Sequence, residues 1–189
     1  MALFDPAVNY VLAGEGKLAE ARPSDPGGIS NWGISIRLLN SLSPSRRKAY
    51  GFSHDLCVPD DVRNMTIDQA KAVYHGEFWT MASFHAIPYQ DIADYVFDAA
   101  VNMGISPAVK CLQRAIWAVA EDRKLLRDDG ILGEVTLGYI KMYGSRVIPA
   151  VRSERAGEYR LIAESNLAER VNLEGWLNRA YGVSPMWDK

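Results

Sequence analysis

The segment AVKCLQRAIWAVAED, residues 108–122, constrains the fold more than any other part of this 189-residue chain. Its apolar side chains recur at helical spacing and leave little polar surface: Val109, Leu112, Ile116, Trp117 and Val119. A helix that is apolar over so much of its surface is buried by its neighbours. We therefore predict a central helix that other helices surround.

Segments on both sides of this helix predict a mainly α-helical protein. Asp5 and Pro6 are typical of a helix start, and a glycine at 14 or 16 is typical of its end. Thr66 and Gln69 form a capping box that opens another helix. We expect further helices within residues 35–42, 87–104, 135–144, 147–165 and 174–183. Turn residues and short alternating pieces between 17 and 35 predict an irregular β-hairpin or small sheet.

Composition excludes several classes of protein. A hydrophobic content of 48% supplies a core, while 23% charged residues and a net charge of −2 exclude a disordered polyelectrolyte. The same balance disfavours a nucleic-acid partner.

No apolar run approaches the ~20 residues that cross a bilayer, and the start of the chain lacks the basic segment of a secretion signal. We expect a soluble protein made in the cytoplasm, without stable membrane insertion.

Patterns for metal and nucleophile chemistry are missing from the sequence. His54, His75 and His85 form no zinc-binding motif, and the loop DDGILGE lacks the carboxylates of a calcium loop. No G-x-S-x-G motif occurs. Cys57 and Cys111 have no metal-ligand spacing, and the sequence leaves open whether they pair. We expect no metal and no cofactor, and a peptidase using Cys57 with His54 is a minor alternative.

The stretch GEGKLAEARPSDPGGISNWGIS, residues 14–35, gathers glycines and prolines around two acids, Glu15 and Asp25. Glu15 follows a predicted helix whose macrodipole disfavours a negative charge, which favours the protonated carboxyl that a general acid needs. Cleavage of a glycosidic bond requires such a proton donor and a group that activates water. Glu15 and Asp25 fit those parts, with Ser30 to hold the water. A pair of solvated loop charges is the alternative.

Four motifs, in order along the chain, resemble glycoside hydrolase family 108, the N-acetylmuramidase-type lysozymes of phage endolysins and bacterial secretion-linked muramidases. The first, GEGK…SDPGGISNWGIS, is similar to the family signature E-G-G…D-x-G-G-x-T-x-x-G-I. The others are YHGEFW…FDAAVNMG, CLQRAI…DDGILGEVTL and EGWLNRAYGV. Together they cover essentially the whole chain.

The resemblance implies an α+β lysozyme-like fold with two helical lobes, a small β-hairpin or sheet in the N-terminal lobe, and a substrate cleft between them. Residues 1–97 would form the catalytic part. Residues 98–189 would form a helical C-terminal lobe that resembles a peptidoglycan-binding region, packed with the first part as one compact body.

The resemblance also implies roles for residues of the first motif. Glu15 matches the essential catalytic acid, and Asp25 matches the aspartate of the D-x-G-G loop. Ser30 stands where the family usually has threonine, so these three residues are similar to the triad of T4-type phage lysozymes, in which Asp and Thr position the attacking water. Lys17 replaces a glycine of the family, which places a cation near the acid and predicts either a substrate contact or a shifted pH optimum.

Four further residues are predicted to bind substrate, each with a structural alternative. Trp32, Tyr74 and Trp79 offer flat rings on which a sugar can stack, but aromatic side chains at these positions also suit a core. Asn102 precedes Met103 and Gly104 in the motif FDAAVNMG, where a role in a cleft competes with capping of a helix end.

The expected function is that of a peptidoglycan hydrolase, a lysozyme that cuts the β-1,4 bond between N-acetylmuramic acid and N-acetylglucosamine. The alternatives are a lytic transglycosylase, which uses one acid and no water, and a wall-binding or secretion-assisting protein without catalysis. We expect a monomeric, bacteriolytic endolysin that reaches the wall in the periplasm after a holin opens the membrane. A prophage or bacterial muramidase fits equally well.

Overall fold

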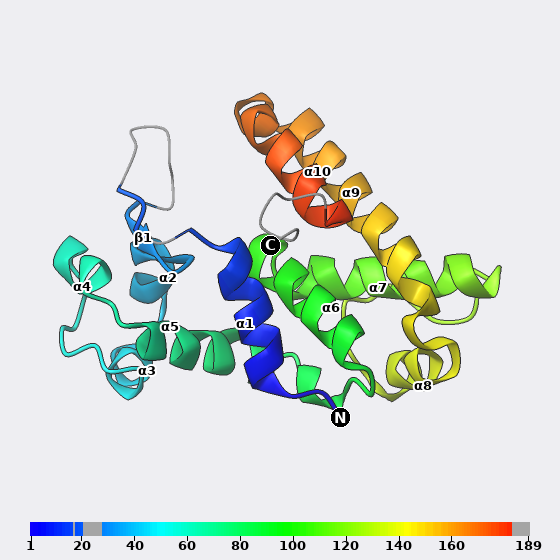
Figure 1. Ribbon diagram of the computed structural model, residues 1–189, viewed down its shortest axis with the longest axis horizontal. Coiled ribbons are helices and arrows are strands. Elements are labelled where there is room, and N and C mark those ends of the chain that lie inside the picture. The colour runs from blue at the N-terminus through cyan, green and yellow to red at the C-terminus, as the bar shows by residue number, and fades with distance from the viewer. Residues whose placement is uncertain (17, 21–27, 183–189) are drawn as a thin grey trace.

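The fold is mainly α-helical, as predicted, with one small antiparallel sheet (Figure 1). The computed structural model describes residues 1–16, 18–20 and 28–182. The first part contains α1 (Phe4–Gly14), β1 (Ser30–Asn31), β2 (Ile34–Ser35), α2 (Ile36–Ser41), α3 (Pro44–Ala49), α4 (Pro59–Arg63), α5 (Ile67–Tyr74), a π-helical turn η1 (His75–Thr80) and a 3-10 turn η2 (Phe84–Ala86). The second part contains α6 (Gln90–Met103), α7 (Ile105–Ala120), α8 (Glu134–Tyr143), η3 (Gly144–Val147), α9 (Ile148–Ser165), η4 (Leu167–Asn172) and α10 (Leu173–Tyr181).

The elements form two groups on either side of α1 (Figure 1). The sheet and α2–α5 lie on one side, and α6–α9 lie on the other. Helix α1 packs along α6, α6 packs on α7, α7 on α9, and α9 on α10. This order brings the end of α1 and the C-terminal helix α10 to the same part of the molecule.

The middle of helix α7 is buried, as predicted from the sequence. Val109, Leu112 and Ile116 are inaccessible to solvent and belong to the main hydrophobic core. The same core includes Val8 of α1 and Val151 of α9, so side chains from both groups of helices share it. The division predicted after residue 97 falls within α6 and stays a prediction.

Local sequence signals explain several helix boundaries. The capping box forms as predicted, because the backbone N–H of Gln69 donates to Oγ1 of Thr66 at 3.2 Å and that of Thr66 donates to Oε1 of Gln69 at 2.9 Å. The start of α1 differs from the prediction: the helix begins at Phe4, so Asp5 lies in its first turn instead of capping it. A carboxylate in the first turn still interacts favourably with the helix dipole.

The helix predicted through Trp79 is α-helical only as far as Tyr74 and continues as the π-helical turn η1. Gly76 allows this turn to meet its neighbour closely, because a Cβ there would collide with the hydroxyl of Tyr50. That hydroxyl donates to Oε1 of Glu77 at 2.6 Å, which gives the buried carboxylate a partner.

In the described ranges, no helix has both the length and the apolar character needed to span a bilayer.

Candidate active site

Glu15 is the first residue after α1, and its extended backbone turns the chain away from the helix axis. Its side chain is 18% exposed. Oε1 accepts a hydrogen bond from Nη2 of Arg179 at 2.7 Å, and the two groups form an ion pair. Arg179 belongs to α10, so the C-terminal helix closes one side of the environment of Glu15.

Asp98 is a second carboxylate that holds Arg179 in place. This carboxylate, in the middle of α6, is 1% exposed. Its Oδ1 accepts from Nη2 of Arg179 at 2.6 Å, and both of its oxygens lie within 3.2 Å of Nε. Burial lowers the pKa of Arg179, but the negative charges of Asp98 and Glu15 more than offset this, so that pKa lies above its usual value. Arg179 is therefore a fixed cation.

A second buried arginine extends the network away from Glu15. Nη1 of Arg155 donates to Oδ2 of Asp98 at 2.8 Å, and its Nε donates to the hydroxyl of Tyr159 at 2.9 Å. The hydroxyl of Tyr159 in turn donates to Oδ1 of Asn102 at 2.6 Å. Side chains from α6, α9 and α10 thus form one connected polar network behind the carboxylate of Glu15. Breaking such a buried pair by removing one partner is strongly destabilising.

The hairpin of β1 and β2 packs on the other side of Glu15. Its register pairs Ser30 with Ser35 and Asn31 with Ile34, which leaves Trp32 and Gly33 as the turn. Both turn residues have positive φ, 51° and 78°, the combination that matches the twist of a two-residue hairpin. Gly33 faces Glu15 so closely that an added Cβ would lie 2.8 Å from Oε2 and collide with the hydroxyl of Tyr74.

Hydrogen bonds from side chains fix this turn in position. The hydroxyl of Tyr74 donates to the carbonyl of Trp32 at 2.9 Å, and the indole Nε1 of Trp32 donates to the carbonyl of Met65 at 3.2 Å. Nδ2 of the buried Asn31 donates to the carbonyl of Val62 at 3.1 Å. The carboxyl of Glu15 therefore lies between a rigid turn and a fixed cation.

Among the predicted catalytic residues, Ser30 lies on the same hairpin as Gly33. Its backbone N–H donates to the carbonyl of Ala19 at 3.0 Å and its carbonyl accepts from Ala19 at 2.8 Å, so the strand is also tied to the segment that follows Glu15. Asp25 and Lys17 lie outside the described residues.

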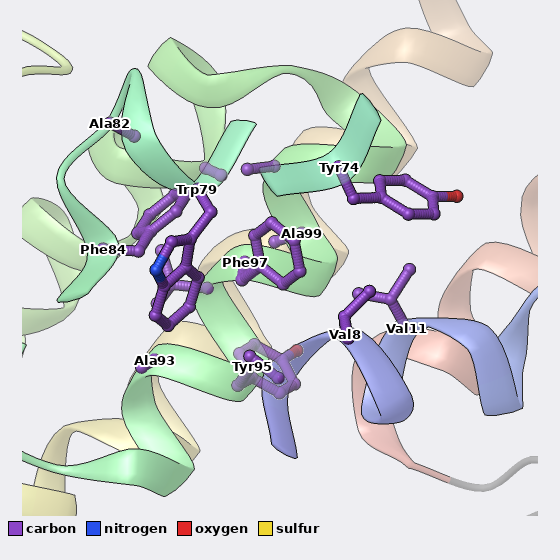
Figure 2. Close-up of a cluster of buried hydrophobic side chains, with 14 of the residues drawn as sticks. Val8, Val11, Tyr74, Trp79, Ala82, Phe84, Ala93, Tyr95, Phe97 and Ala99 are labelled. Atoms are coloured by element: carbon purple, nitrogen blue, oxygen red, sulfur yellow. The ribbon is translucent and has the colours of Figure 1, made fainter. Parts of the chain in front are cut away.

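Two of the predicted sugar platforms are core residues. Tyr74 is 0% exposed and Trp79 is 3% exposed. Figure 2 shows both rings among buried side chains, with Trp79 beside Phe97 and Phe84. The Trp79 and Phe97 ring centroids are 5.3 Å apart at an interplanar angle of 87°, an edge-to-face contact. Neither ring offers a face to a sugar, which corrects the prediction in favour of its structural alternative.

The other two predicted substrate residues have different surroundings. Trp32 is half-buried at the hairpin turn, next to Glu15. Asn102 is exposed and lies within the last turn of α6, where its side chain accepts from Tyr159 instead of capping the helix. It is connected to Glu15 only through the polar network.

The sequence interpretation missed Asp98, Arg155 and Arg179. A signal was present for Asp98, since a charged residue among the apolar positions of a helix needs a buried partner. Asp98 and Arg179 also lie within the quoted motifs FDAAVNMG and EGWLNRAYGV. The pattern did not indicate which of the many arginines would pair with which carboxylate.

Both cysteines are free and buried, so they do not form a disulfide. Burial and the charge of Asp61 raise the pKa of Cys57, and burial raises that of Cys111 to about 12. A thiol with a raised pKa is a poor nucleophile. His54 is engaged with Asp61 at 2.9 Å. These observations disfavour the cysteine peptidase alternative.

Comparisons with known proteins bear on the fold and on the family of the chain. "Structure of Brucella abortus SagA" is similar in fold, with a TM-score of 0.67 and 22% sequence identity over 96% of this chain and 95% of that chain. A search of curated proteins finds no match. The family model described as Glycosyl hydrolase 108 matches residues 8–104, more than half of the chain. These residues include Glu15, the hairpin and Asp98. The chain therefore belongs to the glycosyl hydrolase 108 family of peptidoglycan hydrolases.

Proposed function

We propose that the protein is a lysozyme-type N-acetylmuramidase that cuts the β-1,4 bond between N-acetylmuramic acid and N-acetylglucosamine, with Glu15 as the general acid. One observation carries the proposal: the partly buried carboxyl of Glu15 lies between the hairpin turn at Gly33 and the guanidinium of Arg179. A carboxyl held in a fixed position is what proton transfer to a glycosidic oxygen requires.

Arg179 supports the proton transfer as a positioning residue. When Glu15 gives its proton to the leaving oxygen, a carboxylate forms, and the guanidinium 2.7 Å from Oε1 stabilises that charge. Asp98 shares the same Nη2 at 2.6 Å, so part of the positive charge of Arg179 is already balanced before the reaction.

Water activation is assigned to Asp25 and Ser30. The resemblance to the family supports this assignment, and Ser30 lies on the hairpin whose turn contacts Glu15. We propose that the two side chains position a water against the anomeric carbon. Lys17 and Trp32 would contact the sugar chain beside the reacting bond, since Trp32 is partly exposed at the same turn. Asn102 would bind the substrate through its exposed amide, at the far end of the polar network from Glu15.

Replacing Glu15 by glutamine tests the proposal. Glu15→Gln keeps the shape of the side chain and its contact with Arg179 but removes the acid. Hydrolysis of purified peptidoglycan should fall by about 10²- to 10⁴-fold, the usual contribution of a general acid. Glu164→Gln is the matched control, because Glu164 is an exposed glutamate of α9 that pairs with the exposed Arg170. Glu15→Gln with the activity of the wild type would contradict the proposal.

The family resemblance further supports a role as a bacteriolytic endolysin that acts as a monomer and depends on a holin for release. We expect expression in a bacterial host to cause lysis only when a holin is expressed with it. Lysis without a holin would contradict this part of the proposal.

A further inference from the structure

A cavity lies at the C-terminal end of α7, between this helix and α9. Its volume is about 520 Å³. It is lined by Arg114, Trp117, Ala118, Glu121, Arg123 and Glu154. In Figure 1 this end of α7 lies on the opposite side of α6 from α1, so the cavity is separate from Glu15. Its size lies within the range of small-ligand sites.

Two of the lining side chains are held rigidly by the protein. Nε1 of Trp117 donates to the carbonyl of Leu126 at 2.9 Å, which fixes the half-buried indole. Nε of Arg114 donates to Asp128 at 2.9 Å, and its Nη1 pairs with Glu158. The charge of Arg114 is therefore neutralised, and this residue forms part of the cavity wall.

Arg123 and Glu154 are not held in this way. Within residues 1–16, 18–20 and 28–182, neither side chain makes a hydrogen bond or an ion pair. Glu154 is only partly exposed, and burial raises its pKa, with Glu158 adding to this and the cations of Arg114 and Arg123 opposing it. An additional positive partner would stabilise the charged form of such a partly buried carboxylate.

We propose that this cavity binds a short peptide that carries both a carboxylate and a primary ammonium group. The carboxylate would pair with Arg123, the ammonium with Glu154, and the aliphatic part would lie against the indole of Trp117. In a peptidoglycan hydrolase the ligand with this chemistry is the peptide stem of the wall, so the choice of source rests on the proposed function. A neutral sugar would give neither side chain a partner of opposite charge.

The test is calorimetric titration of the intact protein with a synthetic stem tetrapeptide whose diamino acid has a free amine. Saturable binding is expected, and it should weaken at least about 10-fold in Arg123→Gln and in Glu154→Gln, because each variant loses a charge-assisted hydrogen bond. Acetylation of the ligand amine should weaken binding to the wild type to a similar extent. It should weaken binding to Glu154→Gln little further, because that variant already lacks the partner of the amine. Arg160→Gln is the matched control, since Arg160 is an exposed arginine of α9 outside the cavity.

The inference would be overturned if the peptide did not bind saturably. It would also be overturned if the wild type, Arg123→Gln and Glu154→Gln bound the peptide equally well. Unfolding temperatures close to that of the wild type would show that both variants are folded. The peptide has no glycosidic bond, so its binding is independent of catalysis. An active enzyme that does not bind it overturns this inference alone, whereas an inactive protein that binds it contradicts only the proposed function.

Discussion

Glu15 and Arg179 are 164 positions apart in the chain, yet Oε1 of Glu15 and Nη2 of Arg179 are 2.7 Å apart. Glu15 directly follows α1, and Arg179 lies in α10. The environment of the proposed catalytic acid is therefore completed only when α10 has packed against the rest of the protein. Asp98 connects the two ends, because it binds Arg179 from within the buried α6.

Replacing Arg179 by methionine is expected to lower both activity and stability. The variant keeps much of the apolar volume but leaves Asp98 and Glu15 without this cation. Loss of one partner from a buried ion pair costs about 3–5 kcal/mol, which urea denaturation would measure. Peptidoglycan hydrolysis should fall at least about 10-fold at a temperature where the variant is folded, if the cation stabilises the carboxylate that forms. Arg170→Met, which breaks an exposed pair with Glu164, should leave both quantities nearly unchanged.

Replacing Gly33 by alanine is expected to abolish most of the activity. The new methyl group would lie 2.8 Å from Oε2 of Glu15, at a backbone φ of 78° that disfavours any side chain. The turn, the carboxyl or both must move. Gly138→Ala is the control, since no atom lies within 4 Å of its added Cβ and alanine favours a helix such as α8. Full activity of Gly33→Ala would show that the contact between the turn and Glu15 is not needed.

Replacing Tyr74 by phenylalanine tests the attachment of the turn. The variant loses only the hydroxyl that donates to the carbonyl of Trp32, so stability should fall by about 1 kcal/mol. Since the hydroxyl positions the turn against Glu15, kcat should fall more than KM rises. Tyr89→Phe removes a hydroxyl that donates to the carbonyl of Lys141 in α8 at 3.2 Å, outside the hairpin and Glu15, and should leave kcat unchanged. Equal kinetics for the two variants would contradict a positioning role of Tyr74.

Alkaline pH should destabilise the protein partly through Tyr50. Burial, the hydrogen bond to Glu77 and the charge of Glu77 raise the pKa of Tyr50 from 10.0 to about 12. Because the folded-state pKa is above the unfolded one, this contribution to stability is complete below pH 10 and is lost as the pH rises through about 12. The difference in unfolding free energy between the wild type and Tyr50→Phe should therefore shrink over this window. A constant difference would contradict the assignment.

Local signals were enough to predict much of the fold. The apolar surface of residues 108–122 predicts the buried α7, the capping box predicts the start of α5, and the turn residues predict the hairpin. These features depend on neighbours in the sequence, which a single chain displays directly. The π-helical turn after Tyr74 was not predicted, because its packing against Tyr50 depends on a contact between distant segments.

The site was predictable only in part, for a similar reason. Glu15, Ser30 and the hairpin stand close together in the sequence, so their proximity follows from one motif. The ion pairs of Asp98 with Arg155 and Arg179 join three helices, and no local pattern selects these partners. Tyr74 and Trp79 were ambiguous because an aromatic residue at helical spacing suits a core and a sugar platform equally well; burial decides for the core.

Hydrolysis with Glu15 as the general acid can be tested by mass spectrometry of peptidoglycan that has been digested in heavy-oxygen water. This mechanism predicts fragments that end in reducing N-acetylmuramic acid and carry the heavy oxygen at the cleaved bond. It also predicts that Glu15→Gln, folded as judged by its unfolding temperature, releases almost none of them. Fragments that end in anhydro-muramic acid without heavy oxygen would indicate a lytic transglycosylase and contradict the claim. Release of the labelled fragments by Glu15→Gln at the rate of the wild type would contradict the role of Glu15.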